Sequence, residues 1–119
     1  MTILAGISVL LVALLHAWFL VLEMFLWDKP AGLRAFAQSK EKAAATKVLA
    51  ANQGLYNGFI SAGLLWGLIQ GEEGFDFKVF FLLCVLVAGV YGAITVNRKI
   101  LFIQAFPGLL GLLLVLLAS

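Results

Sequence analysis

The sequence predicts an all-α integral membrane protein, built as a bundle of four transmembrane helices. Hydrophobic residues make up 64% of the 119 residues and charged residues only 12%, whereas a soluble domain is about half apolar and about a quarter charged. The apolar excess lies in four runs of about 20 residues, the length that a helix needs to cross the hydrocarbon. We therefore expect a single domain, residues 1–119, with the lipid bilayer as its surroundings.

The four spans are expected in a regular order along the chain. The first, about residues 3–27, has no Lys or Arg ahead of it and no small-residue cleavage site after it, so we interpret it as a retained span. The others are expected at about residues 48–70, 77–96 and 100–118. Helices satisfy their own backbone groups in lipid, and the alternating pattern of barrel strands is absent from the sequence.

The charges between the spans predict the orientation. Lys and Arg concentrate in cytoplasmic loops of membrane proteins. Here they gather in loop 28–46 and in the short connection after residue 96, whereas the connection at residues 71–76 is acidic. We therefore predict that loop 28–46 is cytoplasmic and that both termini are non-cytoplasmic.

Loop 28–46 contains two signals for the start of a helix. Pro30 suits the first turn of a short helix that would lie on the membrane surface. Ser39 is a candidate cap, with Glu41 in the first turn, for a helix that continues through the alanines into the second span. The alternative is a solvated basic loop without such structure.

Polar residues recur at one depth near the cytoplasmic ends of the spans. At a rise of about 1.5 Å per residue, Glu23 lies about 6 Å inside the boundary at Trp27, and Gln104 lies about 8 Å inside the boundary at Lys99. Gln53, Asn57 and Ser61 share one stripe of the second span, and Asn52 and Tyr56 form the adjoining stripe. The candidate ligand- or ion-binding residues are Glu23, Asn52, Gln53, Asn57, His16, Gln104 and Tyr56.

Glu23 is the least expected of these residues. Charged groups at the centre of a membrane helix cost roughly 2.5–3.5 kcal/mol on insertion scales, and an amide would join helices without that cost. The alternatives are that the amides and His16 serve only packing, and that Glu23 is a protonated or snorkelling acid at the interface. Otherwise, a carboxyl ringed by amides, with a histidine deeper in the span, indicates a proton or cation site.

Helix packing is predicted from small residues and from Pro107. The pair Gly54-x-x-x-Gly58 would allow the backbones of two helices to approach closely. Pro107 is expected to kink the fourth span or to free a carbonyl near Gln104.

Several classes of function are poorly supported. One His and one Cys on different spans do not make a metal site, no cofactor motif occurs, and we expect neither metal nor cofactor. The net charge of +2 is too small to indicate nucleic acid, and Cys84 is expected to be a packed thiol.

Three functions remain open. The first is transport or permeation of a proton, a cation or a small polar solute, with Glu23 as the binding group and a homo-oligomer as the assembly. The second is a membrane enzyme or a binder of an amphipathic small molecule, with Glu23 as acid or base. The third is an assembly subunit, in which the polar layer only joins helices.

Three strings resemble a family of small bacterial membrane proteins, domain of unknown function 1304. They are LEMFLW at Leu22–Trp27, KVLAANQGLYNGF at Lys47–Phe59 and AGVYGA at Ala88–Ala93. The resemblance covers nearly the whole chain and implies a four-helix protein of the bacterial plasma (inner) membrane. It implies no activity.

Overall fold

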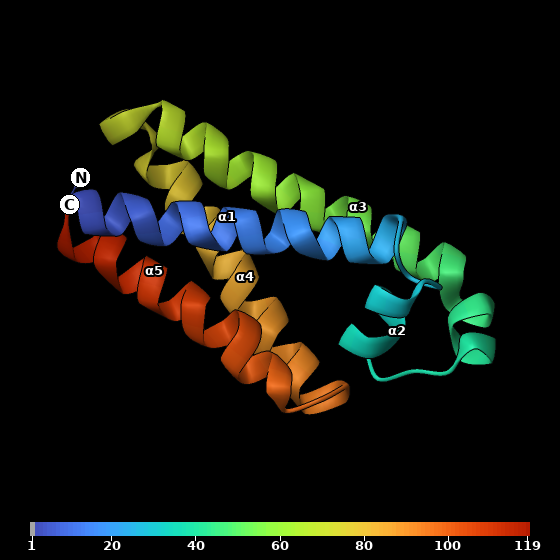
Figure 1. Cartoon of the computed structure of the whole chain (residues 1–119). Coiled ribbons are helices and arrows are strands. Elements are labelled where there is room, and N and C mark those ends of the chain that lie inside the picture. Colours follow the sequence, from blue (N-terminus) through green and yellow to red (C-terminus); the bar gives the residue numbers. More distant parts are fainter. Residues whose placement is uncertain (1) are drawn as a thin grey trace. The chain divides into compact units, whose positions relative to one another are not determined.

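A computed structural model describes residues 2–119, and these residues form helices and their connections, without a strand. The predicted all-α class is confirmed (Figure 1). The elements in chain order are α1 (Ile3–Met24), α2 (Pro30–Ala35), α3 (Lys40–Ile69), the 3₁₀-helix η1 (Gly71–Gly74), α4 (Phe75–Thr95), the π-helix η2 (Leu101–Ala105) and α5 (Phe106–Leu117).

The chain forms two compact units. The larger unit contains residues 2–13 and 60–119, and the smaller unit contains residues 14–59. Each unit is described by itself below.

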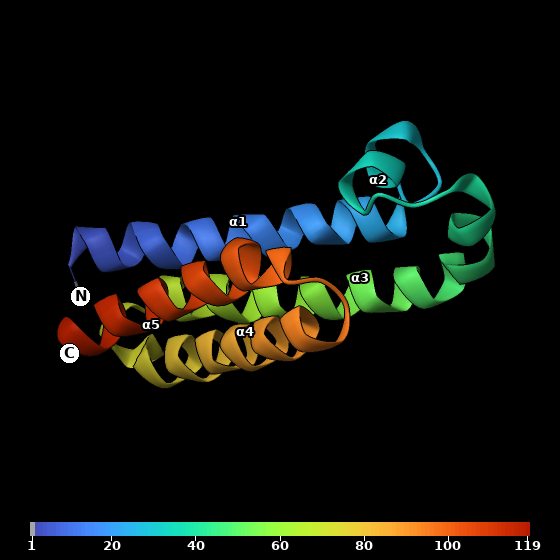
Figure 2. The ribbon, with the colours of Figure 1, turned by 90° about the horizontal axis from the view of Figure 1, so that it is seen from below.

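An apolar core fills the larger unit. Its members come from the first part of α1, the last part of α3, α4 and α5, and include Val9, Leu64, Leu82 and Val85, each with no exposed surface. Helices α4 and α5 lie side by side in both ribbon views (Figures 1 and 2). Glycines bring them together, since a β-carbon on Gly108 would lie 2.7 Å from Val85 Cγ1.

A widened turn precedes α5. Residues Leu101–Ala105 form the π-helix η2, and Pro107 lies in the first turn of α5. Proline has no N–H for the carbonyl four residues earlier, so an ordinary α-turn cannot be completed here. The sequence predicted a kink or a freed carbonyl near Pro107, and the structure has a π-turn directly before it. The backbone of α4 closely approaches this turn, because a β-carbon on Gly89 would lie 2.8 Å from Ala105 N.

The acidic connection before α4 is a tight, ordered turn. A β-carbon on Gly74 would overlap the carbonyl oxygen of Gly67 and lie 2.8 Å from its Cα. Gly71 has a φ of +62°, a conformation that glycine adopts without steric cost. Lys78 Nζ donates a hydrogen bond to Gly71 O at 2.9 Å, so the turn is held from the first part of α4.

Both helix starts predicted for the first loop are present in the smaller unit. Pro30 lies in the first turn of α2, and Lys29 before it is extended, with φ −98° and ψ 164°. Ser39 Oγ accepts a hydrogen bond from Lys42 N at 3.1 Å at the start of α3. Helices thus form at both predicted starts, and most residues of the loop are exposed, as in the alternative of a solvated basic loop.

The helix bounds differ from the predicted spans in three places. Helix α1 ends at Met24, three residues before the predicted boundary, and a turn follows in which Leu26 N donates to Val21 O at 3.1 Å. Helix α3 extends beyond the predicted span at its amino end, because it begins at Lys40 after the Ser39 cap that the sequence predicted. Residues 101–117 form two elements rather than one uniform helix.

Two helical segments, Ile3–Met24 and Gly71–Thr95, are long and apolar enough to cross a membrane, and Leu101–Leu117 is a shorter apolar segment.

Candidate functional site

Glu23 is buried in the smaller unit, at the end of α1. Only 2% of the surface of Glu23 is exposed. It is the single acidic residue of α1. A carboxyl at this degree of burial needs a hydrogen-bond partner, because an unsatisfied charged group in an apolar setting is costly.

Asn57 of α3 provides that partner. Its Nδ2 donates to Glu23 Oε1 at 2.5 Å, which is short for a hydrogen bond of this kind. Gln53, one turn earlier on α3, is an exposed residue on the same face of the helix and lies close to the Glu23 carboxyl. The structure thus brings together three of the seven predicted site residues.

Two glycines allow α3 to reach this carboxyl. A β-carbon on Gly54 would lie 3.0 Å from Glu23 Cβ and 2.7 Å from Met24 Cγ, and one on Gly58 would lie 2.6 Å from Leu20 Cδ1. The predicted close approach at Gly54-x-x-x-Gly58 is therefore present. It places the short Asn57 side chain within reach of Glu23, because the backbones are closer than two side chains would normally allow.

His16 is also buried, with no exposed surface. Its ring packs edge-on against Phe19, with 5.2 Å between the ring centroids. Seven residues separate His16 from Glu23 along α1, which corresponds to about 10 Å. His16 thus lies on the same helix as the carboxyl, but two turns away from it.

Asn52 and Tyr56 point elsewhere. Asn52 Nδ2 donates to Val48 O of its own helix at 3.0 Å, and the side chain is exposed. Tyr56 is 63% exposed and packs against Phe59. Asn52 and Tyr56 therefore do not contribute to the site around the Glu23 carboxyl.

Gln104 has a partner within the larger unit. Its Nε2 donates to Val85 O of α4 at 3.1 Å. This hydrogen bond joins the π-turn to α4, beside the close approach of Gly89 and Ala105. Gln104 thus stabilises the contact between η2 and α4.

The arrangement around Glu23 suits proton binding better than metal binding. In the part of the chain that the structure describes, no three His, Cys, Asp or Glu side chains come together as metal ligands do. A single carboxyl with neutral amide partners can gain or lose a proton without other ligands. An amide can donate to the carboxylate through its N–H groups or accept from the carboxylic acid through its oxygen.

Comparison with known proteins assigns the family. The family model described as Protein of unknown function (DUF1304) matches residues 10–116. The chain belongs to the DUF1304 family. It is also 33% identical over 115 residues to the uncharacterized protein YpaA of Lactococcus lactis subsp. lactis (strain IL1403), covering 95% of this chain and 97% of that one. No solved structure gives a significant match.

The first loop of this DUF1304 member is tied to the start of α3 by side-chain contacts. Trp27 Nε1 donates to Thr46 Oγ1 at 3.1 Å, and the Trp27 ring packs on Phe36 with centroids 4.7 Å apart. Lys47 Nζ donates to Asp28 Oδ2 at 3.0 Å. These contacts fix the residues that directly follow Glu23 and α1.

Replacing Lys47 with glutamine is expected to raise the pKa of Asp28 toward its ordinary value of 3.8, because the hydrogen bond from Lys47 holds the pKa of Asp28 below that value. With its folded-state pKa lowered, Asp28 stabilises the fold above about pH 4, and this contribution disappears as the pH falls through the folded-state pKa. A carboxyl NMR titration of the protein in detergent measures the shift. Lys42→Gln is the matched control, and an equal shift in that variant would contradict the assignment.

Lys78 is a buried residue of this DUF1304 protein that the sequence did not single out. It is only 2% exposed, and Gly67 makes room for its stem, since a β-carbon there would lie 2.8 Å from Lys78 Cγ. A small hollow of about 300 Å³ beside it is lined by Glu72, Phe75 and the end of α5. No local signal in the sequence marks this burial, because the glycine that makes room for Lys78 lies eleven residues earlier in the chain.

Proposed function

We propose that this protein carries protons across the plasma membrane of a bacterium, with Glu23 as the group that binds the proton. The observation that carries the proposal is the nearly complete burial of the Glu23 side chain, with Asn57 as the donor of a hydrogen bond to its carboxyl. Ionisable groups within membrane helices are rare and mark ion pathways and proton relays. The proposal selects the proton from the solutes that the sequence left open.

The choice of the proton follows from the chemistry of the partners. A cation such as Na⁺ or Ca²⁺ needs several oxygen ligands around it. A proton needs only the carboxyl, provided that the neighbouring groups remain hydrogen-bonded in both protonation states. Asn57 satisfies this condition, because its amide has donors for the carboxylate and an acceptor for the carboxylic acid.

A four-span arrangement in the membrane is part of the proposal. Besides the two segments that are long and apolar enough, α3 has 30 residues and so extends about 45 Å, more than the hydrocarbon thickness of about 30 Å. Large apolar side chains are exposed along α4, including Phe80, Val87 and Ile94. Exposed apolar surface of this extent fits lipid surroundings.

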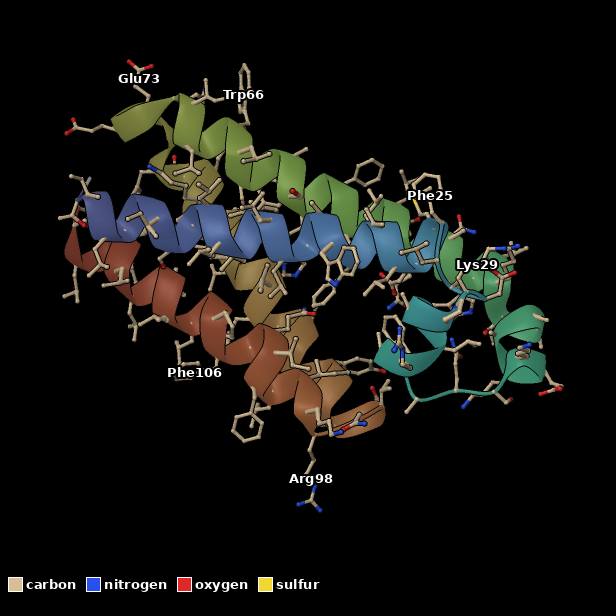
Figure 3. The ribbon with its side chains drawn as sticks, viewed as in Figure 1. Phe25, Lys29, Trp66, Glu73, Arg98 and Phe106 are labelled. Carbon is tan, nitrogen blue, oxygen red and sulfur yellow. The ribbon has the colours of Figure 1, made fainter. Side chains whose placement is uncertain are left out.

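The charges support one orientation of this arrangement. In the larger unit, Glu73 projects just before α4 and Arg98 projects just after it, at the opposite end (Figure 3). The loop between α1 and α3 carries Lys29 and Arg34, and Asp28 is the single acidic residue in it. With positive charges in the cytoplasm, that loop and the connection at Arg98 face inward, and Glu23 lies near the cytoplasmic end of α1.

The deciding experiment measures proton flux with the full-length protein in liposomes. A potassium diffusion potential drives protons, and an enclosed pH-sensitive dye reports them. Wild-type protein is expected to acidify the lumen faster than protein-free liposomes, and Glu23→Gln is expected to reduce the rate to the protein-free level. The reason is that glutamine keeps the size and the hydrogen bond of Glu23 but cannot bind and release a proton in this pH range.

Glu41→Gln is the matched control for this experiment. Glu41 is exposed in the first turn of α3, so its replacement removes one carboxyl without altering the buried site. Flux in Glu41→Gln should equal that of the wild type. Unchanged flux in Glu23→Gln, or wild-type flux no greater than that of empty liposomes, would overturn the proposal.

A further inference from the structure

A second site is suggested by a groove in the larger unit, remote in sequence from Glu23. The groove has a volume of about 920 Å³ and is formed by the last turns of α4, the connection after it and η2. Most of its lining is apolar, and Asn97 and Arg98 supply the polar part.

The apolar lining is open to the surroundings of the protein. Ile94 is 79% exposed, Val96 is 79% exposed and Phe102 is 70% exposed. In the membrane arrangement proposed above, these side chains face the acyl chains of lipids, and the groove gives one such chain a defined place beside Asn97 and Arg98.

The polar end of the groove is positively charged, and the neighbouring part of the sequence supplies no acidic residue to neutralise it. Arg98 and Lys99 are adjacent and both exposed, and residues 77–119 contain no Asp or Glu. The Arg98 side chain projects away from the ribbon at the connection between α4 and η2 (Figure 3). A guanidinium in this setting is suited to bind a phosphate through paired hydrogen bonds.

We propose that this groove binds a phospholipid with an anionic head group. Its acyl chain would lie along Ile94 and Phe102, and its phosphate would contact Arg98. The match is one of charge and polarity, because an apolar channel that ends in a cation is complementary to an apolar chain that ends in an anion. The inference shares with the proposed function only the location of the chain in a membrane, and it concerns a different set of residues.

The test is native mass spectrometry of the full-length protein, delipidated in detergent and titrated with lipids of matched acyl chains. Phosphatidylglycerol is expected to bind more tightly than phosphatidylcholine. Arg98→Gln is expected to weaken phosphatidylglycerol binding about tenfold, the order of effect of one charge-assisted hydrogen bond. Ala93→Phe, which fills the groove from its lining, is expected to weaken both lipids.

Arg34→Gln is the control, since it removes an exposed arginine from the other unit and should leave binding unchanged. Equal binding of the two lipids by the wild type, or equal effects of Arg34→Gln and Arg98→Gln, would overturn the proposal. So would an unchanged affinity in Ala93→Phe, because the acyl chain would then lie elsewhere. Circular dichroism confirms that each variant is folded. A negative result in this lipid-binding test would not contradict the proposed proton flux through Glu23. The Glu23→Gln variant should bind phosphatidylglycerol as the wild type does.

Discussion

Replacing Asn57 with leucine is expected to lower the free energy of unfolding by roughly 1–3 kcal/mol, the cost of leaving a buried carboxyl oxygen without its donor. Glu23 is 2% exposed and receives the hydrogen bond from Asn57 Nδ2, so water cannot easily replace the lost partner. Leucine is close to asparagine in size, which keeps the steric change small. Thermal unfolding in detergent micelles, followed by circular dichroism, measures the loss.

Asn52→Leu is the matched control for this prediction. Asn52 donates to a carbonyl of its own helix and is exposed, so its replacement should change stability by no more than about 0.5 kcal/mol. The double variant Glu23→Met with Asn57→Leu should be more stable than Asn57→Leu alone, because it leaves no buried acceptor unsatisfied. Equal losses for Asn52→Leu and Asn57→Leu would show that the contact with Glu23 contributes nothing.

Replacing Gly74 with valine is expected to destabilise the larger unit by about 3 kcal/mol or more, at or above the usual range for forcing extra atoms into a packed site. The obstacle is backbone, since a β-carbon at Gly74 would overlap the carbonyl oxygen of Gly67. Backbone cannot move aside as the end of a side chain can. The acidic turn would have to separate from the end of α3, which would also disturb the hydrogen bond from Lys78 to Gly71.

Gly92→Ala is the control for Gly74→Val. It tests whether the expected loss of stability comes from the close backbone contact at Gly74 or follows from replacing any glycine of the larger unit. A β-carbon at Gly92 would meet only the Ile100 side chain, at 3.3 Å, and alanine favours the helical conformation of α4. We expect this variant to be as stable as the wild type in the same unfolding measurement. A Gly74→Val protein with wild-type stability would contradict the packing described for the turn.

The features predicted well from the sequence are those that local chemistry determines. The start of α2 follows from the ring of Pro30, and the start of α3 follows from the hydroxyl of Ser39. Each depends on residues within one turn of the helix. The all-α class follows from the length of the apolar runs, and the same runs indicate the two segments that are long enough to cross a membrane.

The candidate site was only partly predictable, because it depends on the rotation of α3 about its axis. Adjacent residues differ by about 100° in direction, so Gln53 and Asn57 can reach Glu23 while Asn52 and Tyr56 cannot. The sequence identified both stripes as polar but contained no local signal for the one that faces α1. The pair Gly54 and Gly58 carried that information, since the close contact with α1 lies on their side of the helix.

The burial of Lys78 was beyond prediction from the sequence for a related reason. A lysine beside an acidic turn is usually exposed. Here its stem is covered by Gly67, which lies eleven residues earlier in the chain, and its Nζ reaches the carbonyl of Gly71. Such a contact becomes visible only after the chain has folded back on itself.

The π-helix at Leu101–Ala105 has a consequence for how related chains differ in length. A π-turn holds one residue more than an α-turn, so deleting a single residue there restores ordinary winding and leaves the helical segments on both sides unbroken. Elsewhere in α4 or α5 the same deletion would rotate every later side chain by about 100° away from its neighbours. Among homologues that differ by one residue in the second half of the chain, the gap should therefore fall at this turn.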